Sequence, residues 1–298
     1  MERLPFIDAH MHLWDLDRID YPWLKPPFDD AGPNGSVAAI ASTYLPADYR
    51  AEGANWNIIG AVHVEAGANP VQSVNETDWL HEMADETGLP TVLVAHAALN
   101  HPSLDAMLAV HASWPRVRGI RHIVNWHPDP NRTYTPADLT QDPVWRAGFA
   151  RLADHGLSFD FQAYPGQFAG VADLFAANTG VPVIINHAGM GVDGAQEWRT
   201  AMALLAQLDH VSVKLSGLGF VWRTPDEGAM RERIVELVEL FGTDRVMLAS
   251  DFPTDRLFGD FDATLARMDA ALSHLSDTER RAIFAGNANR IYRMGVEL

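Results

Sequence analysis

The chain has 298 residues, 47% of them hydrophobic, which suits one large globular domain of the α/β-barrel kind. Its 22 lysines and arginines against 39 aspartates and glutamates give a formal charge of −17, which argues against nucleic acid or an anionic membrane as a partner. Cysteine is absent, so disulfides, a thiolate zinc site and a cysteine nucleophile are excluded. Any metal must therefore be bound by histidines and carboxylates.

The sequence also lacks the features of a membrane or exported protein. No apolar run approaches the roughly 18 residues of a membrane-spanning helix. The first three residues lead directly into a predicted strand, without a signal-peptide pattern. We therefore expect a cytoplasmic protein that acts on a small molecule, and the sequence leaves open whether the chain forms a homo-oligomer.

Short apolar, β-branched runs recur along the chain and predict eight strands, over 6–12, 58–65, 91–97, 119–124, 157–162, 181–186, 211–215 and 245–250. Between them, apolar residues at three- and four-residue spacing predict helices, for instance over 77–87, 142–155, 166–179, 198–207 and 225–241. This alternation is typical of a parallel sheet, and the Gly-rich turn of a doubly wound dinucleotide fold is missing. We predict a (β/α)8 TIM barrel that forms a single domain over 1–298.

One irregular segment, 15–36, follows the first predicted strand. Its prolines forbid a long helix, and its aromatic residues are unusual for a solvated loop. Because the segment leaves the strand at its carboxyl end, it either covers the barrel mouth or forms an ordered surface loop.

Polar side chains stand at the carboxyl ends of three predicted strands, where barrels of this kind carry their chemistry. His10 and His12 end the first strand, and their spacing places them on one face about 7 Å apart. His187 follows the sixth strand and Asp251 follows the eighth. We expect these four side chains to converge on the barrel axis, although a histidine or aspartate at a strand end is often only structural.

The sequence resembles the amidohydrolase superfamily over nearly its whole length. Within it, the resemblance is to the branch of sugar-acid lactonases and 2-pyrone-4,6-dicarboxylate lactonases. The residues that carry it are Asp8–Asp15, Asn75–Leu80, Val117–His122, Asn186–Gly189, Lys214–Leu218, Ala249–Pro253 and Gly286–Tyr292.

The resemblance implies that His10, His12, His187 and Asp251 surround the reacting carbonyl. They would do so around one divalent metal, for which Zn²⁺ is chemically ordinary, or without a metal, as in the pyrone-dicarboxylate relatives. Two-metal relatives carry a bridging lysine or glutamate after the fourth strand, whereas this chain has Arg121 and His122 there. A bridged two-metal site is therefore not expected.

The expected reaction is hydrolysis of a small lactone to its hydroxy acid. Asp251 would act as the general base, and the three histidines would polarise the carbonyl directly or through one metal ion. Alternatively, Asp251 only orients a histidine. Two other functions stay open: metal-dependent non-oxidative decarboxylation of an aromatic or unsaturated acid, and a non-catalytic binding barrel.

Further residues are candidates for binding the substrate. Arg121 is a plausible anchor for a carboxylate or hydroxyl group by the branch pattern. Lys214 lies within an apolar strand, which is costly unless it points into a polar site or forms an ion pair. Tyr164 follows the fifth strand. Trp126 and His127, in the loop after the fourth strand, favour a flat or apolar ring.

Overall fold

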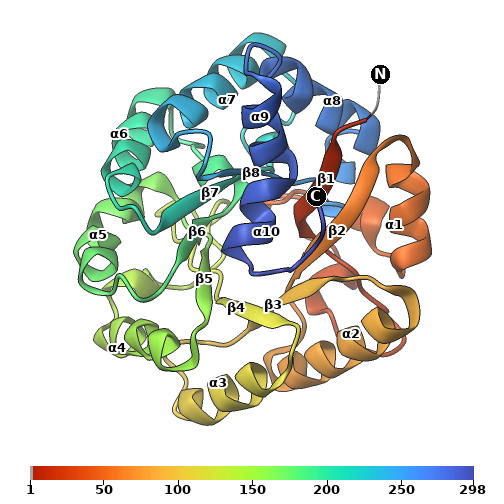
Figure 1. Ribbon diagram of the computed structural model, residues 1–298. Coiled ribbons are helices and arrows are strands. Elements are labelled where there is room, and N and C mark those ends of the chain that lie inside the picture. The colour runs from red at the N-terminus through yellow and green to blue at the C-terminus, as the bar shows by residue number, and fades with distance from the viewer. Residues whose placement is uncertain (1–2) are drawn as a thin grey trace.

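The computed structural model describes residues 3–298 and forms one eight-stranded parallel sheet in the order β1 to β8, confirming the predicted TIM barrel (Figure 1). Every strand lies within or next to a predicted run. The strands are β1 (Pro5–Met11), β2 (Asn57–Val64), β3 (Val92–His96), β4 (Val117–Arg121), β5 (Ser158–Phe161), β6 (Val183–Ile185), β7 (Val211–Leu215) and β8 (Val246–Leu248).

The helices form a ring outside the strands (Figure 1). Several begin at a residue suited to a helix N-terminus: Asp142, Asp226 and Asp260 each accept a backbone N–H of the first turn. Within residues 3–298, none of the helices combines the length and apolar character needed to cross a membrane. They are α1 (Pro46–Glu52), α2 (Ser73–Thr87), α3 (Leu104–Ser113), α4 (Pro143–Arg151), α5 (Phe168–Ala177), α6 (Ala195–Ala206), α7 (Glu227–Phe241), α8 (Phe261–Ala271), α9 (Asp277–Arg281) and α10 (Asn287–Ile291).

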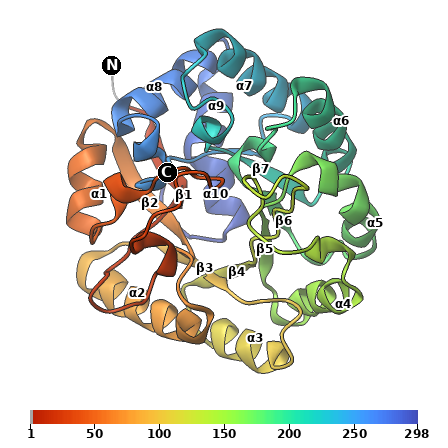
Figure 2. The same cartoon turned by 180° about the vertical axis from the view of Figure 1, so that it is seen from behind.

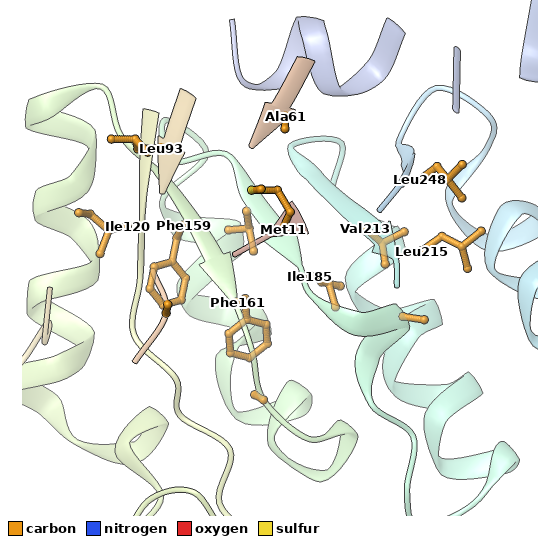
Figure 3. Packing of buried hydrophobic residues seen from close by; sticks show 14 of the residues in the cluster. Met11, Ala61, Leu93, Ile120, Phe159, Phe161, Ile185, Val213, Leu215 and Leu248 are labelled. Carbon is orange, nitrogen blue, oxygen red and sulfur yellow. The ribbon is translucent and has the colours of Figure 1, made fainter. Parts of the chain in front are cut away.

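Two apolar layers follow from the alternation of side chains along the strands. The outer layer packs between the strands and the helices, and Figure 3 shows part of it, with Met11, Phe159 and Leu248 among the labelled side chains. The inner layer fills the barrel with small and branched side chains such as Ile7 and Val62. Tyr292, which directly follows α10, belongs to this inner layer, so the C-terminal segment plugs the end of the barrel seen in Figure 1.

The opposite end of the barrel carries the long loops (Figure 2). The segment after β1, dark red, and the loop after β4, yellow-green, lie in the foreground of this view. This is the end at which the carboxyl termini of the strands meet, and it is where barrels of this kind place their chemistry.

The barrel is closed between its first and last strands by a short seam. The backbone N–H of Asp251 donates to the carbonyl of His10, and the N–H of His12 donates to the carbonyl of Phe252, both at 2.8 Å. Asp8 supports the same seam, because its carboxylate accepts the backbone N–H and the hydroxyl of Ser250 as well as the hydroxyl of Tyr49. The seam thus joins the residues that flank the predicted site.

Candidate active site

A bulge in β1 directs the first two histidines into the barrel. From Asp8 to Met11, β1 advances three residues while β2 advances two. Asp8 faces α1, where it accepts the Tyr49 hydroxyl, so strict alternation would point His10 outward as well. The extra residue reverses this, and His10 and His12 both face inward. Their ring centroids are 5.0 Å apart.

The four predicted residues converge at the mouth of the barrel. Asp251 Oδ1 lies 3.6 Å from His10 Nε2 and 3.3 Å from His12 Nε2, and Asp251 Oδ2 lies 3.6 Å from His187 Nδ1. Donor atoms of His10, His12 and Asp251 all lie within 4.8 Å of one another, so these three could share one metal ion. His187 lies beside this group, with its ring centroid 4.7 Å from that of His10.

The three histidines are neutral. Burial lowers the pKa of His12 to about 3, and burial together with the nearby Lys214 and Arg121 cations lowers the pKa values of His10 and His187 well below the usual range. Neutral imidazoles keep a lone pair that can bind a metal ion.

The contact between His12 and Asp251 places a ring lone pair against a carboxyl oxygen, so it requires either a proton on Asp251 or a bound cation. His12 Nδ1 lies 2.8 Å from the Val64 carbonyl, and a carbonyl only accepts, so the neutral ring carries its proton on Nδ1. Its Nε2 lone pair therefore faces Asp251 Oδ1, and both carboxylate oxygens of Asp251 are buried without a hydrogen-bond partner. Burial also raises the pKa of Asp251. The donor set fits a divalent cation, which would be bound by the lone pair and the carboxylate together.

Arg121 lies next to this cluster and is held by other residues. Its Nε donates to Glu65 Oε1 at 2.6 Å, and its Nη1 donates to Gln162 Oε1 at 2.9 Å. The same Nη1 lies 3.4 Å from His10 Nε2. Arg121 thus brings a fixed positive charge to the site, with its direction set by Glu65 and Gln162. His122, the next residue, turns outward and accepts the indole N–H of Trp145.

Lys214 lies beneath the histidines rather than in the cavity wall. Its ammonium is fully buried and donates to Asp160 Oδ1 at 2.5 Å, while the hydroxyl of Tyr292 donates to the same carboxylate. Nζ also lies 3.5 Å from His10 Nδ1. The lysine therefore contacts the site through His10, and it belongs to a buried ion pair.

His187 sits on a left-handed turn at the end of β6. His187, Ala188, Gly189 and Met190 have φ values of 52°, 49°, 75° and 44°. For residues other than glycine this conformation costs roughly 1–2 kcal/mol each. Strain of this kind persists only where the surrounding structure imposes it, which is common at functional sites.

Gly217 leaves the space that the His187 ring occupies. A Cβ at position 217 would lie 2.7 Å from His187 Cβ and Nδ1, and φ at this glycine is +62°. Gly156 has the same φ, but a Cβ there would have no neighbour within 4 Å. The two glycines therefore separate the effect of the backbone conformation from the effect of the contact with His187.

We predict that Gly156→Ala loses about 1–2 kcal/mol of stability through the backbone alone. Gly217→Ala should lose a further 1–3 kcal/mol, roughly, because the added methyl group overlaps His187. It should also lower kcat, which Gly156→Ala should leave unchanged. Chemical denaturation and steady-state kinetics of both variants check this, and equal losses in the two variants would contradict the proposed contact.

A cavity of about 240 Å³ opens beside the cluster. Segment 15–36 contributes to its wall: the Trp23 indole N–H donates to the Ala66 carbonyl at 2.8 Å, and Asn34 accepts the Tyr134 hydroxyl from the loop after β4. On the side of the predicted catalytic residues the lining consists of His12, Arg121, His187 and Asp251. The remaining wall includes Trp23, Asn34, Ile123, Tyr134, Gln162, Phe220 and Thr254.

The other predicted binding residues lie farther out. Tyr164 lines a second cavity, of about 350 Å³, which shares Phe220 with the first, and its hydroxyl donates to the Arg132 carbonyl. His127 Nε2 lies 3.2 Å from an Asp193 carboxylate oxygen. Trp126 is fixed through its backbone N–H to Gln167. Neither Trp126 nor His127 is among the residues that line the two cavities.

Sequence reasoning missed several residues of the cavity wall, among them Gln162, Asn34 and Tyr134. Gln162 stands at the end of a predicted strand, as the histidines do, and this position was the available signal. Asn34 and Tyr134 belong to long loops and lie 100 residues apart in the sequence. No local sequence pattern predicts a contact between two such residues.

Comparisons with known proteins identify the family of this chain. The sequence matches the family described as Amidohydrolase over residues 7–294. The protein y4mH of Sinorhizobium fredii is 38% identical over 99% of this chain and all of the relative. An L-fucono-1,5-lactonase of Burkholderia ambifaria is 26% identical over 97% of this chain and 95% of that protein.

A crystal structure of an amidohydrolase from Burkholderia multivorans with bound zinc is also similar. It superposes with a TM-score of 0.79 at 25% identity, covering 97% of this chain and 99% of that one. The eight-stranded barrel, the cluster of histidines with an aspartate at its mouth, and a family match over almost the whole length lead to one conclusion. The chain belongs to the amidohydrolase family.

Proposed function

We propose that this hydrolase opens a small lactone to the hydroxy acid at the cavity beside Asp251. The observation that carries the proposal is the Asp251 carboxylate, which is buried, has no hydrogen-bond partner on either oxygen and faces three neutral histidines. A buried carboxylate with free lone pairs is suited to take a proton from a bound water. The similarity to proteins named L-fucono-1,5-lactonase, at 26% and 27% identity, supports a lactone as the substrate class.

In the proposed reaction, Asp251 accepts a proton as water adds to the lactone carbonyl. The ring C–O bond then breaks, and Asp251 returns the proton to the leaving alkoxide, which gives the hydroxy acid. Arg121 contributes fixed positive charge near the oxygen that becomes negative. Its guanidinium is already oriented by Glu65 and Gln162, so little reorganisation is needed during the reaction.

His10, His12 and Asp251, with His187 beside them, would hold one divalent ion, for which zinc is our first choice. When bound, the ion supplies a Lewis acid for the carbonyl and favours the ionised form of Asp251. His12 cannot donate a hydrogen bond from Nε2 in its neutral form, because its proton is on Nδ1. Direct polarisation without a metal would therefore depend on His10, His187 and Arg121.

The cavity limits the size and polarity of the substrate. Its volume of about 240 Å³ lies below the usual range of pockets for drug-sized ligands, which fits a substrate with a single ring. Trp23, Ile123 and Phe220 are the large apolar residues of the wall, and we assign to them the preference for a flat or apolar ring that Trp126 and His127 suggested. We further propose that segment 15–36 covers the bound ring, since Trp23 and Asn34 both line the cavity.

The test is a pH-stat assay on a panel of five- and six-membered lactones, with carbon dioxide release from aromatic acids measured in parallel. The protein is assayed as purified, after chelation and after addition of zinc, and its metal content is measured. We expect acid release from lactones, lowered by chelation and restored by zinc. Carbon dioxide release without lactone hydrolysis would replace the proposal with a decarboxylase, and neither product would reject both reactions.

A further inference from the structure

The left-handed turn that carries His187 is not explained by its own sequence. Of the four residues from His187 to Met190, glycine alone adopts a positive φ without steric cost, yet all four do so. The turn has few internal restraints, namely the N–H groups of Gly189 and Met190 donating to the carbonyls of Asn186 and His187. Contacts from outside the turn must therefore hold it in place.

The main external restraint is Trp198, on α6. Its indole N–H donates to the carbonyl of Ala188 at 2.6 Å, and the side chain is fully buried. The backbone that follows Ala188 lies close to the same side chain. A Cβ at Gly189 would come within 3.2 Å of Trp198 Nε1, and a Cβ at Gly191 would come within 2.7 Å of Trp198 Cβ. The turn is thus fitted around this tryptophan.

Arg233, on α7, contacts the same indole. The guanidinium carbon lies 3.9 Å from the centroid of the Trp198 ring and 4.9 Å from that of Trp222. Arg233 is 5% exposed, and its Nη1 has no hydrogen-bond partner. Burial lowers its pKa to about 10, so it remains charged at neutral pH.

A buried cation without a carboxylate partner is unfavourable unless other contacts compensate for its lost hydration. Among the ion pairs of residues 3–298, none includes Arg233. The two indole faces supply the compensation, because a guanidinium between aromatic rings gains a cation–π contact with each. This sandwich fixes the plane of Trp198 and hence the direction of its N–H bond.

We infer that Trp198 and Arg233 are positioning residues that set His187 against Asp251. The carbonyl that Trp198 holds belongs to the residue directly after His187, so a shift of this bond moves the histidine backbone. The imidazole is then confined by Ser216 Oγ at 3.2 Å from Nδ1 and by the absence of a side chain at Gly217. The catalytic importance of His187 rests on the proposed function. The claim that Trp198 and Arg233 position His187 is independent of that function.

The test compares Trp198→Phe with the control Trp145→Phe. Trp145 is also a fully buried tryptophan with a bonded indole N–H, but its partner is His122, which faces the helices. We expect Trp198→Phe to lower kcat about a hundredfold with KM nearly unchanged, since a displacement of about 1 Å can have this effect on a reacting group. Trp145→Phe should lower Tm by a similar amount and leave kcat unchanged. Arg233→Met provides a second variant if Trp198→Phe does not fold.

Imidazole ¹H–¹⁵N correlations of labelled histidine give a readout independent of activity, with His187 assigned through His187→Gln. We expect the His187 resonances to shift in Trp198→Phe and in Arg233→Met, and to stay in place in Trp145→Phe. Unchanged His187 resonances, or a kcat loss no larger than that of the control, would overturn the inference. If the wild type hydrolyses no lactone, the proposed function fails, and the resonances alone decide whether the pair positions His187.

Discussion

Asp251→Asn is expected to lower lactone hydrolysis by several powers of ten while the barrel stays folded. Asparagine keeps the volume of aspartate but cannot accept a proton from water, so the proposed base is lost. The backbone tolerates the change, because φ at Asp251 is +58° and asparagine adopts this conformation more readily than most residues. The seam bond from the backbone N–H of residue 251 to the His10 carbonyl is also kept.

The measurement is kcat on the best lactone of the panel, with Tm and circular dichroism to confirm the fold. Asp260→Asn is the matched control. Asp260 caps α8 through a bond from the Ala263 N–H at 2.7 Å, and asparagine caps helices as well as aspartate does. We expect unchanged kcat in the control. Turnover of Asp251→Asn within tenfold of the wild type would remove Asp251 from the role of base.

Lys214→Met is expected to destabilise the protein by about 3–5 kcal/mol, the usual cost of removing one partner from a buried ion pair. Methionine matches the unbranched stem of lysine, so the change chiefly removes the ammonium. Asp160 would then be left buried, with the neutral donors Tyr292 and Asn186 and without a compensating charge.

A double-mutant cycle with Asp160→Asn identifies the pair as the cause. Removing both charges leaves no isolated buried ion, so the double variant should lose clearly less stability than the sum of the single variants. Urea denaturation gives the free energies of unfolding. Additive losses would show that the two residues do not stabilise each other. Kinetics at a temperature where Lys214→Met is folded also tests the substrate-binding role predicted from the sequence, through a rise in KM.

The barrel could be predicted from the sequence, because the patterns that indicate its strands and helices are local. Each strand is a short run of buried branched residues, and the helices between them repeat apolar residues at helical spacing. Boundaries were less certain. The predicted strand over 6–12 includes His12, whereas β1 ends at Met11, since the bulge and the crossing to Phe252 end the regular pairing.

The convergence of His10, His12, His187 and Asp251 could be predicted because the carboxyl ends of parallel strands meet at one end of a barrel. The roles of Lys214 and Arg121 could not be separated by the same reasoning, since both stand on strands and both carry a charge. The difference lies in depth: Lys214 pairs with Asp160 beneath His10, while Arg121 reaches the cavity wall. How deep each cation lies in the barrel depends on its partners, which stand on strands distant in the sequence.

The loops were the least predictable part of the site. The wall contact between Asn34 and Tyr134 joins residues 100 positions apart, and the left-handed turn at His187 is held by Trp198, which lies on the next helix. Trp126 and His127 illustrate the converse: their position after a strand suggested the cavity, yet Ile123 and Tyr134 of the same loop line it and these two residues do not. Residue type alone does not determine which way such a loop folds.

Because the site lies at the seam between β1 and β8, it can form only after the last strand has been synthesised. The first strand and the residue after it supply His10 and His12, and Asp251 follows the eighth, so all eight strands must be made before the three proposed ligands can meet. A chain cut short before β8 contains all three histidines of the site but lacks the Asp251 carboxylate that they face. An ion or inhibitor that bridges both strands binds only the completed barrel, and at one hundred times its Kd it would stabilise that closed form by about 2.7 kcal/mol. A ligand bound at the site would thus stabilise the contact between β1 and β8 in the folded protein.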